Sequence, residues 1–129
     1  MPVNAGWQGR ALTVRVLFSQ AGVATQILVA CAGQRALFDA GDGTLRDLLA
    51  NGVDPESLTH LLLTHGHADH VGGLYALLGY LRAQGHTRGL SVWAPRGSHE
   101  AGELVAAFRR CHRHSLPYPP PRGVPGGRR

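Results

Sequence analysis

The sequence has few of the features that place a protein outside the cell or in a membrane. It contains two cysteines in 129 residues, and Cys31 and Cys111 are spaced neither as a disulfide framework nor as a metal knuckle. We therefore expect two reduced, buried thiols. No apolar run is long enough to cross a bilayer, and the polar first ten residues lack the layout of a signal peptide. These absences predict a cytoplasmic protein with no membrane association.

Lysine is absent, so all 13 basic side chains are arginines, and they are unevenly distributed. Six lie in the last 21 residues, which contain no acidic residue, whereas the preceding 108 residues carry seven arginines and eight acidic residues, a net charge of −1. Residues 112–129 are also rich in proline and glycine, which disfavours a helix or a central strand. We predict a partial globular domain over residues 1–111 and a disordered Pro/Gly/Arg-rich tail over 112–129.

Hydrophobic patterning predicts a layered α/β domain with a mixed sheet. Amphipathic stripes predict helices that begin near Thr44, Val71 and Ser98. Thr44 and Asp47 are spaced as in a capping box, and Gly52 is placed to end the first helix. Alternating or continuous apolar segments predict strands over residues 12–18, 26–31, 35–40, 60–64 and 90–94.

Four metal-ligand side chains occupy six consecutive positions directly after the apolar segment 60–64: His65, His67, Asp69 and His70. Imidazole nitrogen and carboxylate oxygen both suit zinc. The cluster would lie at the carboxyl end of a strand, where open α/β sheets place their sites. Asp69 and His70 are adjacent, so their side chains diverge, which indicates two metal positions. A solvated His-rich loop would contain the same residue types, but this spacing between a strand and a helix favours a metal site.

The cluster resembles the His-x-His-x-Asp-His hallmark of the metallo-β-lactamase superfamily, where Val-Gly-Gly often follows, as it does here at residues 71–73. The segment 37–44 is similar to the turn Asp-Cys-Gly-Glu-Gly-Thr of the ribonuclease Z branch, with Ala40 and Asp42 in place of Cys and Glu. Taken alone, Asp39 and Asp42 are interpreted as structural residues. The resemblance spans about residues 12–108 and implies the N-terminal half of the family's αβ/βα sandwich.

The resemblance also implies a site with two Zn²⁺ ions. His65 and His67 would bind the first ion, and Asp69 and His70 the second. Asp69 would in addition transfer a proton as a catalytic residue. Water activated by the two ions would attack a phosphodiester, and RNA, as in the processing of tRNA 3′ ends, is the substrate class of the ribonuclease Z branch.

The family completes this site with a later His, a bridging Asp and a final His that have no credible counterpart here. His112 and His114 run into the tail, His86 and His99 lie in predicted loops and are expected to be exposed, and His60 begins a strand. We therefore interpret the chain as a truncated hydrolase. Its sheet is expected to keep an uncovered face or edge that is open to association, for instance in a homodimer.

Two other interpretations stay open from the sequence. The chain could be a non-catalytic fragment or module that binds metal weakly and contacts nucleic acid through its basic tail, where only Tyr118 could stack on a base. The lactonase, thioester hydrolase and arylsulfatase branches of the superfamily share the metal motif. Among these branches, the turn at residues 41–44 favours the nuclease.

Overall fold

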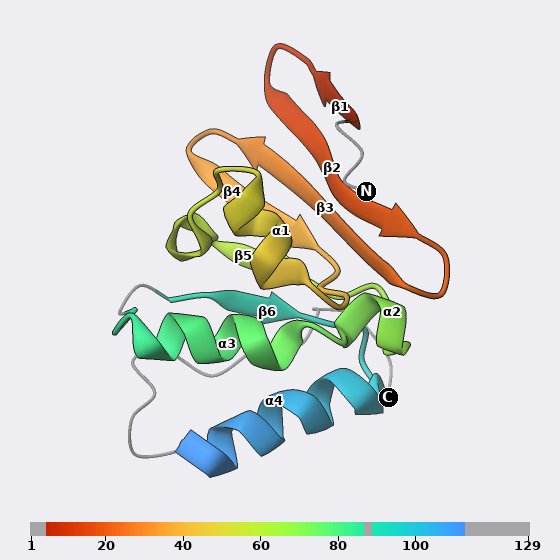
Figure 1. Ribbon diagram of the computed structural model, residues 1–129, viewed down its shortest axis with the longest axis vertical. Coiled ribbons are helices and arrows are strands. Elements are labelled where there is room, and N and C mark those ends of the chain that lie inside the picture. The colour runs from red at the N-terminus through yellow and green to blue at the C-terminus, as the bar shows by residue number, and fades with distance from the viewer. Residues whose placement is uncertain (1–4, 87–88, 113–129) are drawn as a thin grey trace.

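A mixed six-stranded sheet organises the protein (Figure 1). The computed structural model describes residues 5–86 and 89–112. Neighbouring strands are antiparallel from β1 to β4, whereas β5 and β6 continue the sheet in parallel with β4. The strands lie in chain order: β1 (Ala5–Gln8), β2 (Leu12–Gln20), β3 (Ala24–Cys31), β4 (Gln34–Phe38), β5 (His60–Leu62) and β6 (Ser91–Trp93).

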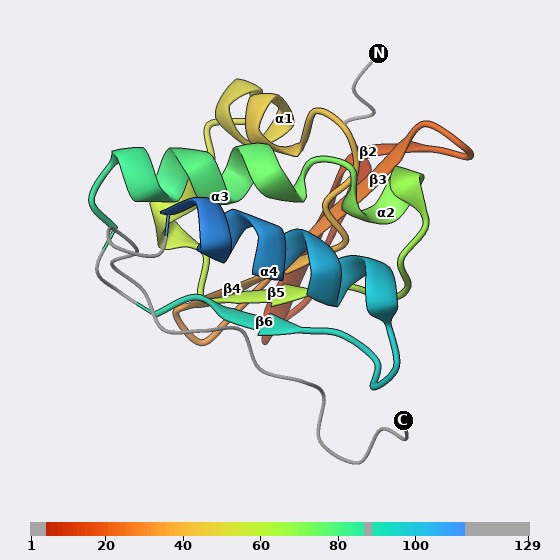
Figure 2. The same ribbon diagram turned by 90° about the horizontal axis from the view of Figure 1, so that it is seen from below.

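The helices follow the antiparallel part of the chain, and those before β6 lie in the crossovers that parallel strands require. The two longest helices, α3 (Leu74–Ala83) and α4 (His99–His112), lie on one side of β4, β5 and β6 (Figure 2). The predicted layered α/β domain with a mixed sheet is therefore confirmed. The helices are α1 (Thr44–Ala50), α2 (Ala68–Val71), α3 (Leu74–Ala83) and α4 (His99–His112), with a short 3-10 turn, η1 (Pro55–Ser57), before β5.

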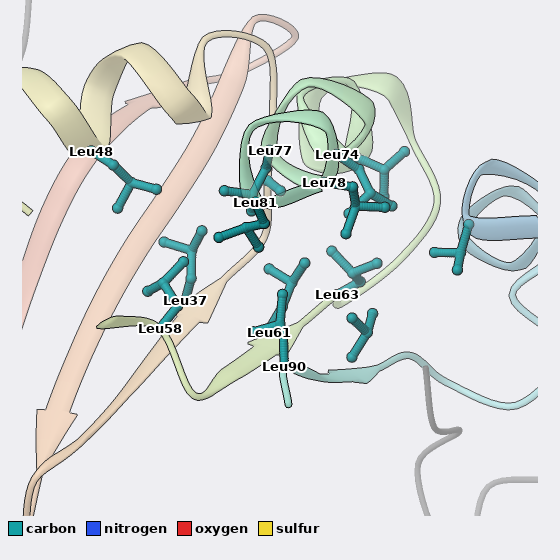
Figure 3. Close-up of a cluster of buried hydrophobic side chains, with 14 of the residues drawn as sticks. Leu37, Leu48, Leu58, Leu61, Leu63, Leu74, Leu77, Leu78, Leu81 and Leu90 are labelled. Atoms are coloured by element: carbon teal, nitrogen blue, oxygen red, sulfur yellow. The ribbon is translucent and has the colours of Figure 1, made fainter. Parts of the chain in front are cut away.

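A leucine-rich core fills the space between this helical layer and the sheet (Figure 3). Leu37, Leu61 and Val92 are aligned across β4, β5 and β6, and all three are buried. Helix α3 covers them with one apolar stripe, made up of Leu74, Leu77, Leu78 and Leu81. This packing holds the carboxyl ends of the three parallel strands at one edge of the molecule.

The opposite face of the sheet is apolar and only partly covered. Ile27, Phe38, Leu62 and Trp93 form the next row across β3 to β6, and each is partly exposed. Within residues 5–86 and 89–112, no second sheet packs on this row. The structure agrees with the uncovered face expected from the sequence, while the homodimer inferred from it stays a prediction.

Several local predictions were wrong. The helix expected from Val71 is divided into α2 and α3 at Gly72 and Gly73, and β1 was not predicted. The capping box is absent, because Gly43 precedes α1 with φ 83° and no side chain caps the helix. Cys31 and Cys111 are exposed rather than buried. Gly52, by contrast, follows the end of α1 with φ 70°, as expected of a terminating glycine.

Two expectations concern the ends and the surroundings of the domain. Helix α4 runs to His112, which the sequence placed in the tail predicted over 112–129. The rest of that tail, residues 113–129, lies outside the described residues. None of the described helices is long and apolar enough to cross a membrane.

Gln26 is fully buried on β3 and connects three parts of the structure. Its Nε2 donates to Asp47 Oδ2 in α1 at 2.6 Å, and its Oε1 accepts from the Gly41 N–H at 3.1 Å. Gln26→Leu is expected to lower the free energy of unfolding by about 2 kcal/mol, because Asp47 and Gly41 lose buried partners. Chemical denaturation would measure this. The exposed Gln34→Leu is the matched control, and equal stability of the two variants would contradict the role of Gln26.

Candidate metal centre

The site forms where three parallel strands end together. β4 leads into Asp39, β5 into Thr64 and His65, and β6 into the loop before α4. The backbone N–H of Asp39 donates to Leu62 O at 2.9 Å, and that of Leu63 donates to Trp93 O at 2.8 Å. The three loops therefore start from one rigid edge of the sheet, the usual position of a site in an open α/β fold.

Three of the four predicted ligands converge at this edge. His65, Asp69 and His70 offer ligand atoms that all lie within 4.8 Å of one another. His70 Nε2 is 3.5 Å from Asp69 Oδ2, and the ring centroids of His65 and His70 are 4.0 Å apart. Such spacing fits two imidazoles and one carboxylate around a single cation.

His67 lies beside this group without belonging to it. Its exposed ring is 4.7 Å, centroid to centroid, from the ring of His65 in an edge-on arrangement. The residue also precedes α2, and its carbonyl accepts hydrogen bonds from the backbone N–H groups of His70 and Val71. The pairing of His65 with His67 around one ion therefore stays a prediction.

Asp39 contacts His70 directly and His65 only through Thr64, a role that sequence reasoning missed. It is 3% exposed and has a left-handed backbone conformation, with φ 67°. Its Oδ1 accepts from the Thr64 N–H at 2.7 Å, and its Oδ2 lies 2.8 Å from His70 Nδ1. The Thr64 hydroxyl is 2.8 Å from Asp39 Oδ2 and 2.9 Å from His65 Nδ1. One feature of the sequence could have indicated this role. Asp39 lies near the end of one predicted strand and Thr64 at the end of the next, so both lie at the carboxyl end of the parallel strands.

These contacts assign a tautomer to each ring. An ionised carboxylate can only accept, so His70 donates to Asp39 from Nδ1–H. The Thr64 hydroxyl gives its one proton to Asp39 and must then accept from His65 Nδ1–H. In their neutral form, both rings therefore carry the lone pair on Nε2. A ring N–H donated to a carboxylate or its hydrogen-bonded partner is the usual support of a metal-binding histidine.

Close backbone packing fixes α2 in this position. A Cβ on Gly41 would collide with the Asp69 carbonyl oxygen and with Ala24, and a Cβ on Gly73 would collide with the Gly41 carbonyl oxygen. The N–H of Ala40 donates to His70 O, and the N–H of Gly73 donates to Ala40 O, each at 2.8 Å. The loop after β4 and the segment that carries Asp69 and His70 thus form one unit.

The remaining described histidines do not belong to the three-residue group. His60 contacts Thr59 Oγ1 at 2.9 Å, and His99 is exposed as expected. His86 was predicted to be exposed but is buried, with Nδ1 3.7 Å from Glu56 Oε1. His112 packs on Phe108 with ring centroids 4.7 Å apart, and His114 lies outside the described residues.

Comparison with known proteins assigns the chain to a family and a fold. The model of the metallo-β-lactamase superfamily matches residues 21–127. The ribonuclease Z of Methanothermobacter thermautotrophicus is 32% identical over 81 residues, and that of Bacillus thuringiensis 36% identical over 80 residues. The crystal structure of human tRNase Z, short form, superposes with a TM-score of 0.70 at 24% identity, covering 81% of this chain.

The match covers only part of each relative. The aligned region spans 63% and 62% of this chain but 26% of both ribonuclease Z sequences, and the fold match spans 42% of the human structure. The six-stranded sheet with its helices therefore corresponds to part of the complete fold. The His65, Asp69 and His70 group suggests metal binding within that part.

Proposed function

Because the chain belongs to the metallo-β-lactamase superfamily, we propose that it forms the metal-binding part of a zinc-dependent phosphodiesterase of the ribonuclease Z type. The observation that carries this proposal is the convergence of His65, Asp69 and His70 at the carboxyl end of β5. Asp39 orients the His70 ring directly, and Thr64 connects Asp39 to the His65 ring. The similarity to two ribonuclease Z sequences supports RNA as the substrate class.

The donor set fits zinc, which takes imidazole nitrogen and carboxylate oxygen and in catalytic sites keeps one position open. His65, Asp69 and His70 lie close enough to hold an ion. In the full two-ion site, His65 and His67 would bind the first ion, and Asp69 and His70 the second. Bound zinc would supply Lewis acidity and lower the pKa of water toward neutrality.

The chain's own residues would have separate roles around the ion. Asp39 keeps the two rings in the tautomer that offers Nε2. The Asp69 side chain is 19% exposed and can therefore reach both the cluster and solvent. This position supports the proposed transfer of a proton by Asp69, since a general acid or base must lie within hydrogen-bond reach of the reacting group.

The partial match to the relatives gives a second candidate. The same group could bind metal without catalysis, because a quarter of a ribonuclease Z leaves other parts of that protein unmatched. The lactonase, thioester hydrolase and arylsulfatase branches are further alternatives, since they share the metal motif.

Hydrolysis of bis(p-nitrophenyl) phosphate by the full 129-residue chain tests the proposal. We expect hydrolysis that requires added Zn²⁺ and disappears with a chelator. His65→Ala should slow it at least about tenfold, since one ligand is lost, whereas the exposed His99→Ala should not. Parallel assays would use a tRNA precursor, a lactone, a thioester and an aryl sulfate.

The outcomes separate the candidates. Cleavage of the tRNA precursor at its 3′ side supports the ribonuclease Z type, and hydrolysis of only one of the other substrates supports that branch. Zinc binding without turnover of any substrate favours the metal-binding module. A chain that binds no zinc contradicts both.

A further inference from the structure

The turn between β2 and β3 reaches the metal centre. The backbone N–H of Gly22, in this turn, donates to Asp69 Oδ2 at 3.2 Å, although the two residues are 47 positions apart in the sequence. Figure 1 shows the turn beside α2, the short helix that carries Asp69. Asp69 therefore receives a donor from a strand pair that contributes no other residue to the cluster.

The geometry of the turn directs this N–H outward. The Val23 N–H closes the turn on Gln20 O at 3.0 Å, which leaves the Gly22 N–H for Asp69. Ala24, at the start of β3, packs against Gly41 together with the main chain of Asp69. The turn and α2 thus both pack against the loop after β4 that contains Gly41. A shift of the turn would therefore move Asp69 as well.

We propose that Gly22 is a positioning residue of the metal centre, whose backbone N–H fixes Asp69 Oδ2 and thereby raises the affinity for zinc. The inference rests on the proposed function, because it requires an ion at the cluster. Metal-binding carboxylates are themselves hydrogen-bonded, and loss of such a partner typically weakens metal binding by about 10–100-fold. A backbone donor does this without adding a competing charge.

The conformation of Gly22 provides a sharp test. Its φ is 74°, and nothing lies within 4 Å of a Cβ added there. Asparagine tolerates this left-handed conformation, whereas a β-branched residue does not. Gly22→Asn should therefore keep the N–H in place, and Gly22→Val should move it, with no clash at Cβ in either case.

Zinc affinity of the full chain would be measured by competition with a chromophoric chelator. We expect Gly22→Val to bind about tenfold more weakly than wild type. Gly22→Asn and the exposed neighbour Val23→Thr should bind as wild type does. Thermal unfolding checks that all variants fold. Equal affinity of Gly22→Val and Gly22→Asn would overturn the inference.

A second readout is the position of the Gly22 amide resonance, and its first comparison is made without metal. In the ¹H–¹⁵N spectrum of the zinc-free chain, Asp69→Ala should shift the Gly22 amide resonance upfield, and adding zinc to wild type should shift it again. An unmoved Gly22 resonance in Asp69→Ala overturns the inference while leaving the proposed function intact. If wild type binds no zinc, the proposed function fails and the inference fails with it.

Discussion

Asp39→Ala is expected to weaken zinc binding by about 10–100-fold and to lower the free energy of unfolding by about 3 kcal/mol. The buried carboxylate accepts from the Thr64 N–H and the Thr64 hydroxyl, and it contacts His70 Nδ1. Its removal leaves these donors without their acceptor and frees the His70 ring. The Thr64 hydroxyl beside His65 Nδ1 also loses the carboxylate that orients it. Calorimetric titration with zinc and urea denaturation would measure the two effects.

Asp39→Asn separates affinity from stability. The amide oxygen can still accept from Thr64, and asparagine tolerates the φ of 67°, so most of the stability should persist. Its NH₂ group would face His70 Nδ1 and force the ring proton onto Nε2, which removes the lone pair offered to zinc. We expect a stable protein with weak zinc binding. Wild-type affinity in this variant would refute the tautomer assignment, and Asp42→Asn, exposed in the same loop, is the control.

Gly73→Ala is expected to destabilise the protein by at least about 3 kcal/mol, the upper end of the usual cost of overpacking. The new Cβ would collide with the Gly41 carbonyl oxygen, a backbone atom that cannot move aside without shifting the loop after β4. The same shift should displace α2 and reduce zinc affinity. Denaturation and zinc titration on one preparation would detect both losses.

Gly79→Ala is the matched control for this substitution. Gly79 lies within α3, and no atom is within 4 Å of its added Cβ. Alanine is the better helix former by about 1 kcal/mol, so this variant should be slightly more stable than wild type. If Gly73→Ala were as stable as Gly79→Ala, the close approach of the two segments would not hold the site together.

Local sequence was sufficient for much of the fold. The strands 12–18, 26–31, 35–40, 60–64 and 90–94 were each found, with ends shifted by a few residues, because alternation and apolar runs report burial directly. β1 was missed, since its four residues contain a glycine and only one large apolar side chain, Trp7. The break between α2 and α3, at Gly72 and Gly73, was also missed. The close approach of Gly73 to the Gly41 carbonyl oxygen is a tertiary contact, and the apolar periodicity of the segment does not show it.

The cysteines and His86 show the limit of assigning burial residue by residue. Cys111 lies on an apolar stripe of α4 but faces solvent, and His86 follows α3 in a loop yet is 4% exposed. Helical periodicity gives the direction of a side chain around its own axis. Periodicity does not show whether a neighbouring helix or strand extends far enough to cover that side chain.

The sequence by itself predicted a cluster of candidate ligands and determined its place after a strand. His65, His67, Asp69 and His70 are separated by at most five positions, so the motif is recognised without any distant partner. Tertiary structure alone decided what orients them. Asp39 contacts His70 across 31 positions and Gly22 contacts Asp69 across 47, and these contacts exist only because parallel strands end at one edge and a hairpin turn packs on α2. Spacing along the chain identifies the candidate ligands, whereas hydrogen bonds between distant segments orient their side chains.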